Sequence, residues 1–162
     1  MALQKAANDE LTTEQITPVS YAAPFAPIEA ARMENRSFDP FEVLPTFQRL
    51  HRTHRSLLVE GVGGWLVPLS ENYSSADLAK AMGLPVLLIV RNRLGALNHT
   101  LLTLESIQSR GLVCGGIVLN NHPADAGDPA AEGNSRLIPS LTNIPVLFEI
   151  APGQTELDLA VA

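Results

Sequence analysis

The chain has 162 residues, is 46% apolar and 17% charged, and carries a formal charge of −6 at pH 7. This length fits one domain, and this composition favours a buried core over disorder. The negative charge and the scattered arginines exclude a protein that binds the nucleic-acid backbone. A single cysteine, Cys114, excludes an internal disulfide and favours the cytoplasm. Residues 1–10 contain no long apolar run, so we expect neither a signal peptide nor a membrane span.

The front of the chain predicts helices joined by loops. Residues 2–7 indicate the end of a helix, and the stretch 12–27, rich in Pro, Thr and Ala, favours an extended or looping path. A short helix is expected over residues 28–34. A longer helix should begin at Asp39-Pro40, because this pair reads as an N-cap followed by proline at the first helical position. Its apolar stripe would consist of Phe41, Val43, Leu44, Phe47 and Leu50.

Uninterrupted apolar runs farther along the chain predict buried strands. They lie at residues 56–59, 85–90, 116–120 and 145–150. Such runs are typical of parallel strands covered on both faces. Between the second and third run, residues 98–110 predict a helix with a stripe that ends before Gly111, and therefore a right-handed crossover. The stripe contains Leu101, Leu102, Leu104 and Ile107.

The last part of the chain predicts a surface loop over residues 122–134, a short helix over 135–141 and a brief helical end at 156–161. Together these elements predict one α/β domain over residues 1–162, with three layers around a mostly parallel sheet.

A carboxylate and a glycine-rich turn follow the first predicted strand, in the order Val59-Glu60-Gly61-Val62-Gly63-Gly64-Trp65. Ligands bind at the carboxyl edge of such sheets. Glu60 could hold Mg²⁺ there, and glycines let backbone N–H groups approach an anion. The alternative is a plain tight turn beside a solvated acid.

Two further polar elements follow the next strands. Arg93-Leu94-Gly95-Ala96-Leu97-Asn98-His99-Thr100 opens the predicted helix, and Asn98 or Thr100 could cap it and leave N–H groups for a carboxylate or phosphate. Asn120 and Asn121 end the third strand and could bind a heterocycle. Capping and turn formation alone would equally account for these asparagines. We expect all three polar elements to converge on one edge of the sheet.

The order and spacing of these blocks resemble those of the dethiobiotin synthetase family. The resemblance runs from about residue 3 to residue 150. Its motifs are residues 59–65 with Pro68-Leu69, residues 84–87 leading into 94–99, and residues 116–120. It implies a fold of the P-loop NTPase type and a ligase of biotin biosynthesis that uses ATP and Mg²⁺. Such a ligase closes a ureido ring on 7,8-diaminopelargonate with CO₂, through a carbamate and a carbamic-phosphoric anhydride.

The resemblance also implies roles for individual residues. Glu60 would bind Mg²⁺, and the region of the carbamate and phosphate would be lined by Gly61, Val62 and Gly63. The nucleotide's adenine would meet Asn120, with Asn121 beside it. The substrate's carboxylate tail would be held across a homodimer interface by Gly95, Ala96, Leu97 and Asn98. No residue is implied as a covalent catalyst, because phosphoryl transfer rests on positioning and charge neutralisation.

One departure from the family pattern is large. The family's Gly-x-x-x-x-Gly-Lys-Thr loop has no counterpart, because Gly-Lys-Thr occurs nowhere in the 162 residues. We therefore expect a sheet that lacks the family's first strand and P-loop helix, and no ATP turnover by this chain alone. The match joins the family pattern inside a helix, as a late start codon, a gene fragment or a trimmed gene model would produce.

Two other classes of function remain open. One is a non-catalytic binding or regulatory remnant, and the other is an accessory domain of a different P-loop superfamily member. Asn98-His99 after Leu94-Gly95 favours dethiobiotin synthetase over the latter.

Overall fold

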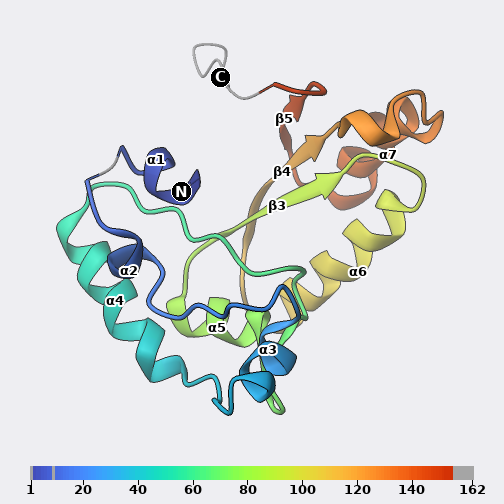
Figure 1. The fold of residues 1–162 in the computed structure, drawn as a ribbon. Helices are drawn as coiled ribbons and strands as arrows, with labels where there is room; N and C mark the ends of the chain where they lie inside the picture. The colour runs from blue at the N-terminus through green and yellow to red at the C-terminus, as the bar shows by residue number, and fades with distance from the viewer. Residues whose placement is uncertain (1, 9, 155–162) are drawn as a thin grey trace. The chain divides into compact units, whose positions relative to one another are not determined.

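The computed structural model describes residues 2–8 and 10–154, so the helical end predicted at 156–161 lies outside the described residues. Contacts divide the chain into two units, Met1–Gly83 and Leu84–Ala162 (Figure 1). Whether both belong to a single domain, as the sequence predicts, stays a prediction. None of the described helices is long and apolar enough to cross a bilayer.

The first unit consists mainly of helices and loops. Its elements are α1 (Ala2–Ala6), α2 (Thr13–Ile16), α3 (Pro27–Met33), α4 (Pro40–Thr53), a hairpin of β1 (Pro68–Ser70) and β2 (Tyr73–Ser74), and α5 (Ser75–Met82). The predicted start of α4 is confirmed, because the Asp39 carboxylate accepts a hydrogen bond from the Phe41 N–H at 2.9 Å. Short α2 interrupts the stretch that was expected to be extended. The buried apolar residues of this unit are Ala30, Ala31, Leu50, Leu69 and Ala76.

The strand predicted at residues 56–59 is wrong. No strand forms there, and the Leu58 and Val59 residues are 84% and 43% exposed. An apolar run becomes a strand only when a neighbour accepts its backbone hydrogen bonds. Among the described residues, the only strand pair of this unit is the hairpin of β1 and β2.

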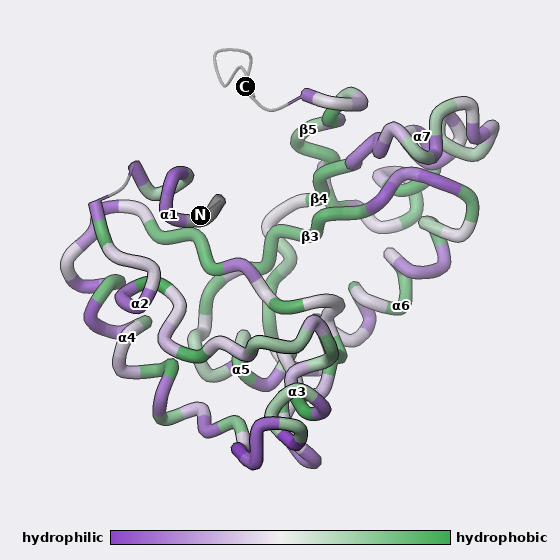
Figure 2. The backbone as a smooth tube through the Cα atoms, viewed as in Figure 1, coloured by the Kyte–Doolittle hydropathy of each residue, from purple (hydrophilic) through white to green (hydrophobic). Residues whose placement is uncertain are grey.

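The second unit contains the parallel sheet that the sequence predicts. Its strands are β3 (Val86–Arg91), β4 (Cys114–Asn120) and β5 (Val146–Ile150), in the order β3-β4-β5 and all parallel. The crossover helices are α6 (Ala96–Ser109) and α7 (Ala130–Thr142). Figure 2 shows the apolar run of β3 in green, turning purple at the strand's end. The α/β class with a parallel sheet is confirmed. Helix α7 begins earlier than predicted and takes part of the expected surface loop.

The core of this unit lies between the sheet and its two helices. Ile117 and Leu119 of β4, Ile107 of α6 and Ile138 of α7 are fully buried. Because successive strands are added in one direction through right-handed crossovers, both helices cover the same face. Accordingly Leu87 and Ile89 of β3 are 42% and 53% exposed, and the prediction that every strand is buried on both faces is wrong for β3.

The buried stripe of α6 differs in part from the predicted one. Leu104 and Ile107 are buried as expected, whereas Leu101 and Leu102 are 39% and 57% exposed. The remaining buried positions, Ala96 and Thr100, lie one helical turn apart on the same face as Leu104. Apolarity alone did not show which face of this leucine-rich helix meets the sheet.

Candidate functional site

The carboxyl ends of β3 and β4 lie together and carry polar residues. Asn92, the first residue after β3, donates its backbone N–H to the carbonyl of Asn120 at 2.9 Å. Its side-chain Nδ2 donates to Asn121 Oδ1 at 2.9 Å. The polar elements expected after these two strands therefore meet at one edge. The third element, the glycine-rich turn, belongs to the first unit, and its convergence with them stays a prediction.

Helix α6 begins differently from the prediction. Its N-cap is Gly95, in the left-handed conformation with φ of 91°, and no side chain caps the helix. Capping by Asn98 or Thr100 is therefore wrong. Asn98 lies exposed in the first turn, while Thr100 is 1% exposed and its Oγ1 has no hydrogen-bond partner. The first N–H groups of a helix have no intrahelical acceptor, so this end still suits an anion.

Two shallow pockets flank this edge. The first has a volume of about 210 Å³ and lies between β3 and α6, where Arg93, His99 and Thr100 contribute to its lining. The second has a volume of about 260 Å³ and is lined by Asn92, Asn121 and the loop after β4. A concave space with a few polar groups is the usual form of a small-molecule site.

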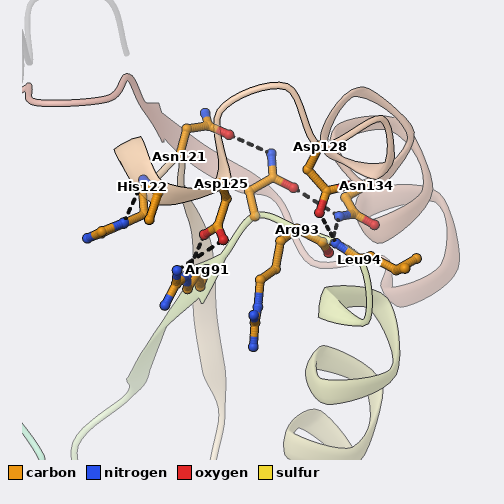
Figure 3. A network of polar contacts seen from close by, with 10 residues as sticks. Arg91, Arg93, Leu94, Asn121, His122, Asp125, Asp128 and Asn134 are labelled. Atoms are coloured by element: carbon orange, nitrogen blue, oxygen red, sulfur yellow. Dashed lines mark hydrogen bonds and ion pairs between the residues drawn. The ribbon is translucent and has the colours of Figure 1, made fainter.

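The loop after β4 is held by two aspartates. Asp125 forms an ion pair with Arg91, in which Arg91 Nη2 donates to Asp125 Oδ1 at 3.0 Å. The hydrogen bond from Arg91 lowers the pKa of Asp125 below its usual value. Asp128 accepts from the Leu94 N–H at 2.8 Å and the Ala130 N–H at 2.9 Å, which joins the start of α6 to that of α7 (Figure 3). Both carboxylates therefore stabilise the conformation of this loop.

A second set of polar contacts was missed from the sequence. Asn134 of α7 is 6% exposed, and its Nδ2 donates to Asn92 Oδ1 and to the Arg93 carbonyl, both at 3.0 Å (Figure 3). Asn121 Nδ2 in turn donates to Glu149 Oε1 at 3.1 Å. The available signal was weak: one asparagine directly after a strand and another within a helix, neither of which indicates its partner.

The glycine-rich turn has a defined shape in the first unit. Gly63 has φ of 66°, and a Cβ there would lie 2.9 Å from Val67 Cγ2, whereas a Cβ on Gly61 would meet nothing within 4 Å. Glu60 is exposed and does not end a strand, contrary to the prediction. It makes no hydrogen bond or ion pair among the described residues, which also contain no group of three metal-binding side chains. Glu60 is therefore a free carboxylate beside an accessible backbone.

Comparisons with known proteins identify the class first. Residues 1–158 match the family model described as an AAA domain. This match agrees with the α/β architecture and its parallel sheet, and places the fold in the P-loop NTPase type.

Individual relatives narrow the class. The ATP-dependent dethiobiotin synthetase of Akkermansia muciniphila is 40% identical over 159 residues, which cover 98% of this chain and 74% of that protein. The protein of the same name from Anaeromyxobacter sp. strain K is 46% identical over 131 residues, covering 80% and 58% of the two chains. The one from Bacillus subtilis strain 168 is 37% identical over 145 residues, covering 90% and 62%. The chain belongs to the dethiobiotin synthetase family, and spans about three quarters of the first relative and about three fifths of the other two.

Proposed function

We propose that the chain takes part in the ATP-dependent dethiobiotin synthetase reaction of biotin biosynthesis. In this reaction a ureido ring is closed on 7,8-diaminopelargonate with CO₂, and ATP supplies the driving force. The observation that carries the proposal is the meeting of Asn120 and Asn121 with Asn92, in the loop that leads from β3 into α6, at one edge of a parallel sheet in a chain of this family. Ligands bind at this edge in open α/β folds. The expected compartment is the cytoplasm, because the lone Cys114 fits a reducing environment.

Asn120 is the proposed contact to adenine, with Asn121 beside it. The Asn120 carboxamide makes no hydrogen bond among the described residues and is partly exposed, so it can donate to and accept from a base. Asn121 lines the pocket of about 260 Å³. A heterocycle in that pocket would lie against Asn121, the residue that follows Asn120 in the chain.

Gly95, Ala96, Leu97 and Asn98 are the proposed site for the carboxylate tail of the substrate. The uncapped start of α6 offers backbone N–H groups, and Asn98 is exposed beside them. Contribution of this site across a homodimer interface is part of the proposal.

Glu60 is the proposed magnesium ligand, and Gly61, Val62 and Gly63 are the proposed lining of the phosphate region. Mg²⁺ usually keeps several waters and takes one or two protein carboxylates together with substrate phosphates. One free carboxylate next to an accessible backbone fits that requirement. The bound ion would neutralise phosphate charge, while the turn supplies N–H donors to an anion.

The 162-residue chain alone is proposed not to complete the reaction. It contains no Gly-Lys-Thr sequence, and none of its other motifs supplies a cradle of N–H groups with a lysine at the β- and γ-phosphates. Losing one preorganised donor of this kind costs about 10²- to 10³-fold in rate, and here the set is larger. A second candidate is a non-catalytic module that binds the substrate tail or nucleotide, which the uncapped start of α6 and the Asn120 carboxamide, without a partner among the described residues, favour.

An assay of dethiobiotin formation from diaminopelargonate, bicarbonate, ATP and Mg²⁺ tests this proposal. The purified chain should be inactive, and fusion behind the segment of a relative that precedes the matched residues and contains the P-loop should restore activity. Glu60→Gln in the fusion should abolish it, whereas Glu71→Gln, at another exposed acidic position of the same unit, should not. Robust synthesis by the unfused chain would refute the proposed dependence on a P-loop. An inactive fusion whose chain still binds diaminopelargonate would favour the binding module.

A further inference from the structure

Side-chain hydrogen bonds form a chain across the carboxyl ends of all three parallel strands. Asn134 Nδ2 donates to Asn92 Oδ1 at 3.0 Å, and Asn92 Nδ2 donates to Asn121 Oδ1 at 2.9 Å. Asn121 Nδ2 then donates to Glu149 Oε1 at 3.1 Å. Asn92 follows β3, Asn121 follows β4 and Glu149 lies in β5, so this amide chain connects three strands and α7. Figure 3 shows the part of it between Asn121 and Asn134.

Glu149 sets the direction of the whole amide chain. An ionised carboxylate only accepts hydrogen bonds, so Asn121 must turn its NH₂ group toward Glu149 and its carbonyl oxygen toward Asn92. Asn92 must then present its own NH₂ group to Asn121 and its oxygen to Asn134. Ser135 Oγ donates to the same Glu149 carboxylate at 3.1 and 3.2 Å, which helps to hold it in place.

Asn92 is the junction of this amide chain. The residue is 1% exposed, and its Nδ2 donates to the Ala131 carbonyl at 3.3 Å as well as to Asn121. Its backbone N–H donates to the Asn120 carbonyl at 2.9 Å. Through Asn134, which also donates to the Arg93 carbonyl, Asn92 is tied to the loop that opens α6. One buried side chain therefore joins the two loops that carry the proposed ligand contacts.

The two asparagines at the end of β4 differ in what their side chains do. The Asn121 carboxamide is used on both sides, by Asn92 and by Glu149. The Asn120 carboxamide has no hydrogen-bond partner among the described residues. Only Asn120 therefore has its full hydrogen-bonding capacity left for a ligand.

We propose that Asn92 is a positioning residue of the nucleotide site: its side chain orients Asn121 and through Asn121 fixes the end of β4 that carries Asn120. The inference rests on the proposed role of Asn120 toward adenine. Asn120 is then the group that touches the base, and Asn121 acts through its position. A side chain with a purely structural role would change the stability of the fold without changing the affinity of the folded protein.

Asn92→Asp in the full chain separates these roles. The variant keeps the size of the side chain and can accept from Asn134, but it cannot donate to Asn121 or to the Ala131 carbonyl. We expect ADP, titrated calorimetrically well below the unfolding midpoint, to bind about tenfold more weakly, as is common when a group that orients a binding residue is lost. The side-chain NH₂ signals of Asn120 and Asn121 in ¹⁵N-correlated NMR spectra should shift.

Two further variants complete the experiment. Glu149→Gln tests the amide chain at a position where misfolding is not expected, and Ser140→Ala is the control for substitutions in α7 that do not touch it. Glu149→Gln, at an exposed position, removes the fixed direction of the amide chain and should shift the Asn121 signals with a smaller loss of ADP affinity. Ser140→Ala removes only a local bond to the Leu137 carbonyl at the other end of α7, and should leave ADP affinity and both asparagine signals unchanged.

The inference is overturned if folded Asn92→Asp, or Glu149→Gln where the former does not fold, keeps wild-type ADP affinity and wild-type Asn121 signals. A wild-type chain that binds no ADP instead counts against the nucleotide part of the proposed function. In that case the Asn121 signals of the two variants alone decide whether the amide chain positions this residue.

Discussion

Residues 56–59 and strand β3 are similar as sequence and different as structure. Both are short apolar runs that the sequence predicts as buried strands. Val86–Arg91 pairs with β4 along its length, whereas residues 56–59 form no strand and leave Leu58 84% exposed. The difference shows that an apolar run supplies only the preference for a strand, because the backbone hydrogen bonds of a parallel sheet all come from a neighbour.

The polar residues of the two units also differ in whether they have partners far away in the sequence. In the second unit the residues after the strands bond to one another across large sequence separations, as in the contact of Asn92 with Asn121. In the first unit Glu60 has no such contact among the described residues. The second unit thus has polar residues fixed by hydrogen bonds at the sheet edge, whereas the first has a carboxylate without a partner among the described residues. Substitutions in each unit test whether the two units also differ in stability.

The largest expected effect is that of truncating the buried centre of the sheet. Ile117→Ala should lower the free energy of unfolding by about 2–5 kcal/mol, because Ile117 is fully buried in β4. Leu58→Ala, a matched truncation in the run that forms no strand, should change it by less than about 0.5 kcal/mol. Urea unfolding followed by circular dichroism measures both. A comparable loss in the two variants would mean that residues 56–59 are buried in solution.

An intermediate effect is expected in the glycine-rich turn. Gly63→Ala should cost about 1–2 kcal/mol, because φ of 66° disfavours a side chain and the added Cβ would meet Val67 at 2.9 Å. Gly61→Ala is the control, since its Cβ would lie in open space. Thermal unfolding of both variants compares them. Equal midpoints would contradict a fixed turn shape at Gly63.

The smallest effect is expected for the ion pair of Arg91 and Asp125, and it should depend on pH. The pKa of Asp125 is lowered from 3.8 by its bond to Arg91, so the stabilisation is present above that value and is lost as the pH falls through the lowered pKa. Arg91→Gln should therefore be less stable than wild type at pH 7, and the gap should begin to narrow below about pH 3.8 and close only below the lowered pKa.

The control for this prediction lies in the first unit. Arg32 pairs with Glu29 within one turn of α3, and both side chains are largely exposed. Arg32→Gln should thus lower stability less than Arg91→Gln, because the pair that it removes lies within one helical turn and does not connect segments far apart in the chain. Urea midpoints of both variants at pH 7, 5 and 3 make the comparison, and a gap for Arg91→Gln that is as wide at pH 3 as at pH 7 would contradict the assignment to Asp125.

The sequence by itself determined the elements whose signals are local. The apolar runs located β3, β4 and β5, and Asp39-Pro40 located the start of α4, because strand preference and helix capping depend on a few adjacent residues. The ordered blocks around Gly95 and Asn120 were also enough to indicate the family. Strand preference, helix capping and family motifs can all be recognised from a few adjacent residues.

Only the tertiary structure decided which residues meet. It left residues 56–59 without a strand partner, turned Ala96 and Thr100 of α6 inward in place of Leu101 and Leu102, and brought Asn134 to Asn92 across 42 residues. Pairing, the choice of buried face and the partners of buried amides depend on groups far apart in the chain. A single sequence shows what each residue can do, whereas contact between distant residues selects which of these possibilities is used.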